Sequence, residues 1–169
     1  MQNITNIVWL KRDLRLTDHL PLYNAIQKQE DFLILYIYEP SLMQDVHFDE
    51  RHGRFIEQSL SDIQDELLTL DKKLTVACGE ATEIFQLLID RYNIKNIFSH
   101  EEIGLKISYS RDLKLNLLFK KYQISWHEYQ SNAVIRGLTN RKNWEHDWNK
   151  VMRSPIEKIN LIEARILHH

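Results

Sequence analysis

The stretch "NIVWLKRDLRLTDHLPLYNA", residues 6–25, places a short apolar run, a cluster of charges and a helical pattern in direct succession. Residues 6–10 are bulky and apolar, which predicts a buried strand. Residues 20–29 have helical spacing, with Asp18 as the expected N-cap and Pro21 in the first turn. A strand that leads directly into a helix is the first half of a β-α-β unit. This stretch therefore predicts an α/β fold.

Strand-length apolar runs and longer amphipathic segments continue to alternate up to residue 130. Further strands are expected at residues 31–40, 74–79, 94–100 and 124–129. Further helices are expected at residues 49–70, 80–92 and 106–122. The run 31–40 is nearly continuous apolar, as is typical of a central parallel strand covered on both faces. The sequence therefore predicts a five-stranded, doubly wound parallel sheet of Rossmann-like type, with helices on both faces.

Composition limits the function classes. There are 22 Lys and Arg against 24 Asp and Glu, so the bulk charge indicates neither a nucleic-acid nor a membrane surface. The single cysteine, Cys78, excludes an internal disulfide and a thiolate metal cluster, and we expect it in the core. His100, His127 and His146 lack metal-ligand spacing, which favours structural roles. No long apolar run or targeting signal is present, so we expect a cytoplasmic protein without membrane contact.

Residues 131–169 differ in character from the rest of the chain, with more turn residues and scattered basic side chains. We expect a domain over residues 1–130, followed by the start of a linker. The spacing of Trp144 and Trp148 predicts a helix that packs against a further domain, and the stretch from residue 156 to the end predicts another helix. Four basic residues could contact a phosphate backbone or remain solvated; they are Arg136, Arg141, Lys142 and Lys150.

Ligands of open parallel sheets bind at the edge where the strands have their carboxyl ends, near the point where the strand order reverses. The segments "KRDLRLTDH", "YIYEP" and "SHEEIG" follow three expected strands and should meet there. Neither G-x-G-x-x-G nor G-x-x-x-x-G-K-[ST] occurs, so the usual cradles for dinucleotides and nucleoside triphosphates are missing. The four charged residues of the first segment could instead form a structural ion-pair network; they are Arg12, Asp13, Arg15 and Asp18.

The stretch "VWLKRDLRLTDHLPLYNA" resembles the opening signature of the DNA photolyase and cryptochrome flavoproteins. Four later stretches are similar to the same family, in the same order: "LYIYEPSL", "RHGRFIEQSLSDIQDEL", "FSHEEIGLKISYSRD" and "NAVIRGLTNRKNWEHDWNKVM". The resemblance covers almost the whole chain. It implies the N-terminal α/β domain of the family, with the helical FAD domain beginning beyond residue 169.

In photolyases, as the resemblance implies, reduced FAD in the helical domain donates an electron to a pyrimidine dimer flipped out of DNA. The α/β domain of many members binds an antenna chromophore, which is a folate, a deazaflavin, flavin mononucleotide (FMN) or a lumazine. The implied partners are the C-terminal FAD domain and damaged DNA, and the parent protein would be a carbon–carbon lyase. This chain would then carry no catalytic residue. The alternatives are the same domain of a blue-light-sensing cryptochrome, or a free-standing nucleotide-binding module.

The antenna would lie at the carboxyl ends of the strands, where Tyr36 and Tyr38 share one side of the second strand and could stack a planar ring. Packing is the alternative role for both tyrosines. The expected hydrogen-bond acceptors are Glu39, Glu101 and Glu102, and the expected contacts to a phosphate or glutamate tail are His52 and Arg54. Arg12 and Asp13 complete the expected cofactor-binding set. His19 departs from the family pattern, which often has Asn at this position.

Overall fold

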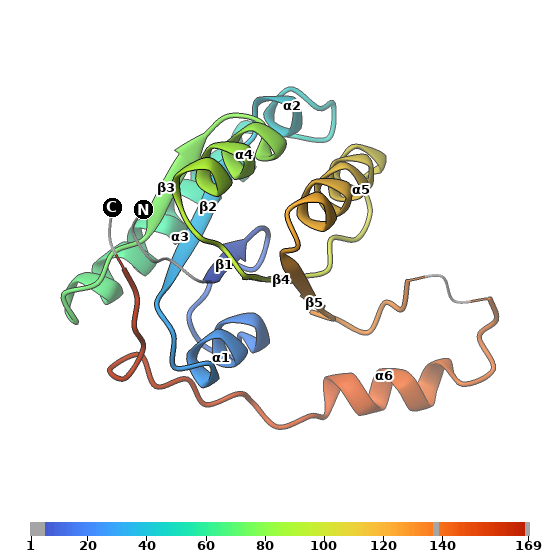
Figure 1. Ribbon diagram of the computed structural model, residues 1–169. Coiled ribbons are helices and arrows are strands. Elements are labelled where there is room, and N and C mark those ends of the chain that lie inside the picture. The colour runs from blue at the N-terminus through green and yellow to red at the C-terminus, as the bar shows by residue number, and fades with distance from the viewer. Residues whose placement is uncertain (1–5, 137–138, 168–169) are drawn as a thin grey trace.

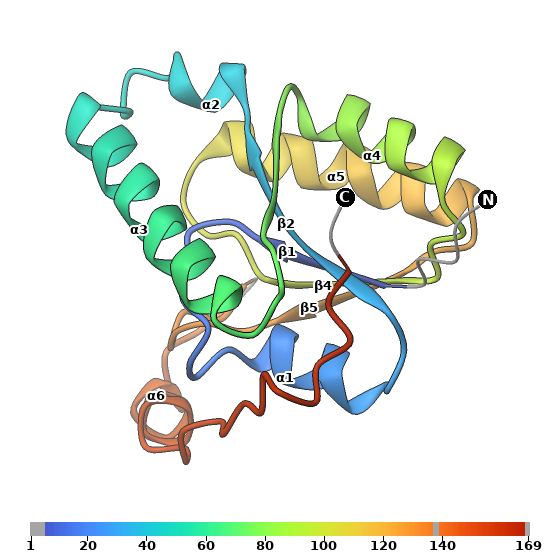
Figure 2. The same ribbon diagram turned by 90° about the vertical axis from the view of Figure 1, so that its left-hand side faces the viewer.

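The computed structural model describes residues 6–136 and 139–167. In these residues a single parallel sheet has helices packed on both faces (Figures 1 and 2). Its strands are β1 (Asn6–Leu10), β2 (Phe32–Tyr38), β3 (Thr75–Cys78), β4 (Asn96–His100) and β5 (Ser125–Tyr129). They are arranged in the order β3-β2-β1-β4-β5, with every pair parallel. The predicted doubly wound sheet is therefore confirmed.

The helices are α1 (Leu20–Gln27), α2 (Pro40–Met43), α3 (Glu50–Leu68), α4 (Ala81–Arg91), α5 (Lys106–Lys121) and α6 (Trp144–Met152). Side chains alternate across β1, so that Val8 packs with α1 and α3 while Ile7 packs with α4 and α5 on the opposite face. Figure 2 shows these two helix layers on either side of the sheet. None of the described helices is long and apolar enough to cross a membrane.

The strand order reverses between β1 and β4. The chain moves outward from β1 through β2 to β3 and then crosses back to β4 on the other side of β1. Loops that leave β1 and β4 therefore diverge, which opens a crevice at the carboxyl ends of these strands. The charged turn after β1 lies at this edge of the sheet.

Two local predictions are wrong. The N-cap of α1 is His19, whose Nδ1 accepts a hydrogen bond from the backbone N–H of Leu22 at 3.1 Å. Asp18 instead has a left-handed backbone, with φ of 49°, and its carboxylate accepts from the N–H of Glu157 at 3.3 Å. Cys78 is exposed and is not a core residue, because β3 is a short edge strand whose alternate side chains face solvent.

The helix predicted from residue 156 onward is also absent from the described part of this segment. The chain instead runs beside α1 and returns to the sheet, where Ile166 pairs in parallel with Phe32 (Figure 1). The N–H of Phe32 donates to the carbonyl of Arg165 at 3.1 Å, and the N–H of Leu167 donates to the carbonyl of Phe32 at 2.9 Å. The short β3 pairs with β2 only from Leu35 onward. This leaves the start of β2 open to pairing with a second segment.

Candidate functional site

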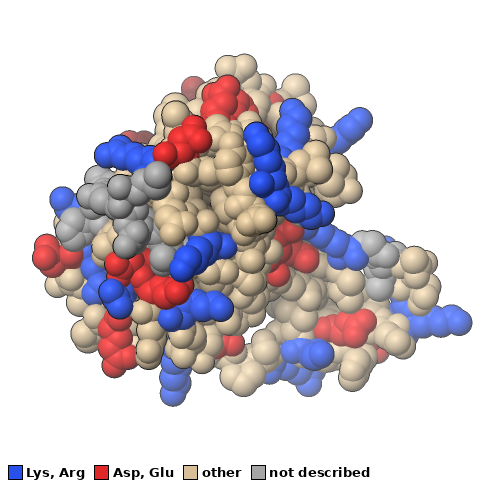
Figure 3. All heavy atoms as spheres, viewed as in Figure 1, with Lys and Arg blue, Asp and Glu red and all other residues tan. Residues whose placement is uncertain are grey.

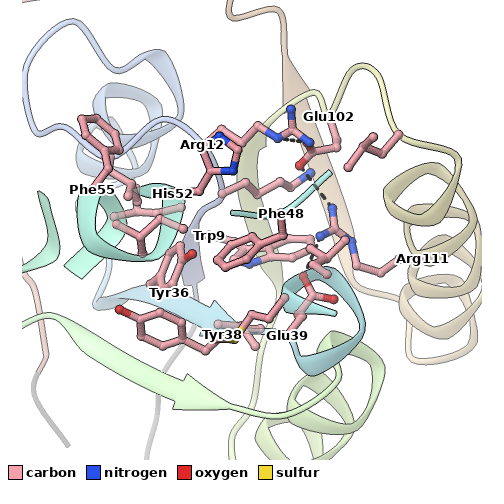
Figure 4. Close-up of a pocket in the computed structure, with 18 of the residues that line it drawn as sticks. Trp9, Arg12, Tyr36, Tyr38, Glu39, Phe48, His52, Phe55, Glu102 and Arg111 are labelled. Atoms are coloured by element: carbon pink, nitrogen blue, oxygen red, sulfur yellow. Dashed lines mark hydrogen bonds and ion pairs between the residues drawn. The ribbon is translucent and has the colours of Figure 1, made fainter. Parts of the chain in front are cut away.

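A cavity of about 400 Å³ opens at the carboxyl ends of β1 and β2. Its aromatic lining comes from both strands, from the connection after α2 and from α3 (Figure 4); the aromatic residues are Trp9, Tyr36, Tyr38, Phe48 and Phe55. The rings of Tyr36 and Tyr38 meet edge to face, with centroids 5.0 Å apart. The prediction that these two tyrosines share one side of β2 is therefore confirmed.

One wall of the cavity is a chain of ion pairs (Figure 4). Nε of Arg12 lies 2.7 Å from Oε1 of Glu102, and Nη2 of Arg111 lies 3.4 Å from the other oxygen of that carboxylate. Nη1 of Arg111 also donates to Oε1 of Glu39 at 2.6 Å. Only Arg12 is substantially exposed, with 62 % of its side chain accessible. Two arginines and two carboxylates therefore balance one another along the cavity wall.

Burial shapes the ionisation of this wall. It raises the pKa of Glu39, an effect that the neighbouring guanidinium of Arg111 opposes. For Arg111, burial favours the neutral form, but the carboxylates around it outweigh burial and raise the pKa. Burial also raises the pKa of Tyr36 well above its usual value, so its phenol stays protonated and can donate a hydrogen bond.

A second group of charges surrounds Lys11, which lines the cavity and lies next to the Trp9 ring. Nζ of Lys11 is 3.5 Å from Oδ2 of Asp112 and 4.0 Å from Oε1 of Glu128. Burial lowers the pKa of Lys11, and the nearby carboxylates oppose this shift. Arg136 joins the group from the long C-terminal excursion, with Nη1 3.3 Å from Oε1 of Glu128. Arg136, one of the four basic residues considered for phosphate contact, is therefore already paired with a carboxylate of β5.

Arg111 and Asp112 were missed by sequence analysis. They lie in the middle of α5, on the face that also buries Leu115 and Phe119. Two adjacent charges in register with a buried apolar stripe need partners, because an unpaired buried charge is costly. That register is the sequence signal that could have found them.

Asp13 does not line the cavity, although it is adjacent to Arg12. Its Oδ2 lies 2.7 Å from Nε2 of His19 and 2.6 Å from Nδ1 of His100, and all three side chains are buried. Burial opposes ionisation of this carboxyl, but hydrogen bonds from His100 and His19 outweigh it and hold the pKa of Asp13 far below its usual range. His100 is therefore partnered, in a cluster that its sequence spacing did not reveal.

The Asp13 cluster has the ligand types of a metal site. However, Nδ1 of His19 accepts the N–H of Leu22, so the neutral imidazole carries its proton on Nε2, which lies 2.7 Å from Oδ2 of Asp13. Its Nε2 therefore lacks the lone pair that a metal ion needs. This tautomer favours a closed hydrogen-bonded triad of His19, Asp13 and His100 over a metal centre.

Three residues of the expected cofactor-binding set remain, of which one lines the cavity and two do not. His52 lines the cavity and, through Nδ1, accepts the N–H of Asp49 at 3.1 Å. Arg54 and Glu101 do not line it: Arg54 is exposed and lies 3.6 Å from Glu50, and Glu101 lies 3.7 Å from Nε of Arg136. The structure thus brings six of the nine residues together around the cavity; they are Arg12, Tyr36, Tyr38, Glu39, His52 and Glu102.

The surface around α6 combines basic and aromatic side chains. Arg141, Lys142 and Lys150 are exposed, and Figure 3 shows basic and acidic groups together on this part of the molecule. Trp144 and Trp148 are 47 % and 37 % exposed. Their packing against a further domain stays a prediction, as does the domain boundary at residue 130.

The chain matches the DNA photolyase family over residues 6–159. It is 30 % identical over 123 residues to cryptochrome DASH of Gloeobacter violaceus. The aligned region is 69 % of this chain and 25 % of the relative. The chain is 29 % identical over 104 residues to cryptochrome DASH of Synechocystis sp., and the aligned region is 59 % of this chain and 21 % of that relative. The chain therefore spans a quarter or less of the length of these curated relatives.

Two solved structures share the fold. The photolyase from the archaeon Sulfolobus tokodaii has a TM-score of 0.75 at 22 % identity, covering 96 % of this chain and 38 % of its own. A cryptochrome from Synechocystis sp. has a TM-score of 0.74 at 21 % identity, covering 93 % of this chain and 36 % of its own. The fold is that of the N-terminal α/β domain of these proteins. The sequence match and the fold agree, and the chain belongs to the DNA photolyase family.

Proposed function

We propose that this chain is the antenna domain of a deoxyribodipyrimidine photolyase, in which the cavity at the ends of β1 and β2 holds a light-absorbing chromophore. The full-length flavoprotein would repair pyrimidine dimers in DNA under light, and these 169 residues alone would be inactive. The observation that carries the proposal is the aromatic cavity of about 400 Å³ at the edge where α/β sheets bind ligands. Energy transfer needs a chromophore held at a fixed distance and orientation, which a preformed aromatic pocket supplies.

The lining favours a flavin, deazaflavin or lumazine ring over a folate. The glutamate tail of a folate is anionic and needs available cations, but the cations of this wall already pair with carboxylates within the domain. A chromophore without an anionic tail, such as riboflavin or a ribityllumazine, has no such need and gains stacking surface on Tyr36 and Tyr38. The Sulfolobus photolyase was solved with two FAD molecules, which implicated a novel light-harvesting cofactor in that protein and supports a flavin-like antenna here.

The residues of the cavity have separable roles in this proposal. Tyr38 and Phe48 would flank the ring from β2 and from the connection after α2. The protonated phenol of Tyr36 would donate to a ring carbonyl, since burial raises its pKa. Arg12 would cover the open side of the ring while keeping its ion pair with Glu102. A bound antenna would absorb light and pass the excitation to the FAD of the catalytic domain.

Binding is tested by titrating the chain with riboflavin, FMN, an 8-hydroxy-5-deazaflavin, a ribityllumazine and a methenylated tetrahydrofolate, with fluorescence anisotropy as the readout. We expect one of the ring systems other than the folate to bind at one equivalent. Tyr38→Ala should weaken that binding about tenfold through lost stacking. The matched control is Leu117→Ala, which truncates an exposed residue of α5 outside the cavity. Binding of adenosine nucleotides with no binding of any chromophore would favour the free-standing module and overturn the proposal.

Repair is tested with ultraviolet-damaged oligonucleotides under blue light. We expect dimer splitting by the full-length protein and none by residues 1–169 alone. A full-length protein that binds FAD without splitting dimers would favour the cryptochrome alternative. Splitting by the 169-residue chain would contradict the division between antenna and catalytic domains.

A further inference from the structure

Among the aromatic residues that line the cavity, Trp9 has the side chain that is easiest to oxidise by an excited chromophore. It lies in the central strand β1, it is one of the residues that line the cavity, and its side chain is almost fully buried (Figure 4). Indole is the most easily oxidised of the ordinary aromatic side chains, and an excited flavin-type ring is a one-electron oxidant. An electron that left Trp9, entered the excited ring and then returned would change no bond. It would nevertheless release the absorbed energy as heat.

Two cations lie over the Trp9 ring. Nζ of Lys11 is 4.5 Å from the ring centroid, and Cζ of Arg111 is 4.8 Å from it. Both are within the range of a cation–π contact. Such a contact stabilises the neutral ring and opposes its oxidised, positively charged form. Loss of an electron from Trp9 is therefore more costly here than for an indole without cations.

Both cations are held in place. Arg111 pairs with Glu39 and Asp112, and its side chain is 9 % exposed. The Lys11 side chain is 4 % exposed and pairs with Asp112, and its backbone N–H donates to Oδ1 of Asp13 at 2.7 Å. The carboxylates partly offset the positive charge at Trp9. The two cations themselves lie within cation–π distance of the ring.

We propose that Lys11 and Arg111 protect the excited antenna by making Trp9 a poor electron donor. The inference rests on the proposed function, because it concerns a chromophore in the same cavity. It assigns to these two buried cations of the cavity lining a role beyond folding: they keep the absorbed energy available for transfer. Lys11 and Arg111 are positioning residues in this account, since they act through Trp9.

The test uses riboflavin as the bound probe and its fluorescence lifetime as the readout. Lys11→Met removes one cation and keeps an unbranched side chain that is one atom shorter, so we expect the lifetime to shorten about two- to tenfold. Adding Trp9→Phe to this variant should restore the lifetime, because the electron donor is gone. Lys114→Met, in an exposed lysine of α5, is the matched control and should change nothing. An unchanged lifetime in Lys11→Met, or equal shortening with Phe at position 9, would overturn the inference.

A second readout separates this inference from the proposed function. The protein is illuminated with riboflavin in solution, and oxidation of each tryptophan is measured by peptide mass spectrometry. We expect Lys11→Met to raise the oxidation of Trp9 relative to exposed Trp144 at least about twofold, with thermal unfolding verifying that the variant is folded. If riboflavin shows no affinity, the flavin form of the proposed function fails, and this ratio still decides the role of Lys11. An unchanged ratio in a folded variant would contradict it.

Discussion

Arg12 and Asp13 are neighbours in the same charged turn, yet the structure gives them opposite surroundings. The Arg12 side chain is 62 % exposed and lies at the cavity, paired with Glu102. Asp13 is buried in the closed triad with His19 and His100. The difference shows that the turn has two structural roles: one residue borders the cavity, and the next connects β1, α1 and β4. Four predictions test this contrast, in order of decreasing effect.

Arg111→Met should give the largest loss of stability. Arg111 is the centre of the cavity wall, and its removal leaves the buried carboxylates of Glu39 and Glu102 without their shared partner. We expect a loss of about 3–5 kcal/mol in the free energy of unfolding, measured by urea denaturation. A loss below about 1 kcal/mol would show that the wall is not a buried ion-pair network.

Asp13→Ala should destabilise the domain by about 3 kcal/mol, because two buried imidazoles lose their common acceptor. Asp13→Asn keeps an acceptor oxygen and should recover part of this loss. Denaturant midpoints of the two variants give the comparison. Equal loss in both variants would mean that the charge of Asp13, and not its hydrogen bonding, stabilises the turn.

His19 should make stability fall as the pH falls from 7 to 5. Burial lowers the pKa of His19 below its ordinary value of 6.5, so the unfolded chain takes up a proton there before the folded domain does. Stability is therefore fully present above that value and decreases below it, by at most about 1.4 kcal/mol per pH unit. His19→Asn should flatten this part of the profile, as measured by urea denaturation at each pH. An unchanged slope would show that His19 is not held neutral.

Arg12→Gln should change stability least. Its ion pair is largely exposed on the arginine side, so we expect a loss within about 1 kcal/mol. In contrast, chromophore binding should weaken, because Arg12 borders the cavity. Anisotropy titration beside urea denaturation separates the two effects. A loss of stability as large as that of Asp13→Ala would remove the contrast between the neighbours.

Local patterns were enough to predict most of the elements of the sheet and its helices. Apolar runs of strand length and amphipathic helices depend on neighbouring residues, so the five strands and the alternation of Tyr36 and Tyr38 could be predicted. The course of residues 156–167 could not be predicted, because burial of Ala164 and Ile166 against the sheet outweighs local helical preference.

The residues of the candidate site also fall into those that the sequence could predict and those that it could not. The charged turn, the tyrosines of β2 and the glutamates after β2 and β4 are close to strand ends, so topology alone indicated their shared edge of the sheet. The partners of these residues are far away in the chain: Arg111 is 72 positions from Glu39, and His100 is 87 positions from Asp13. Which charges become paired, buried or left at the cavity depends on three-dimensional packing. Short-range pattern therefore determined the scaffold and the edge of the sheet at which the cavity lies, whereas only long-range contacts determined the surroundings of each side chain.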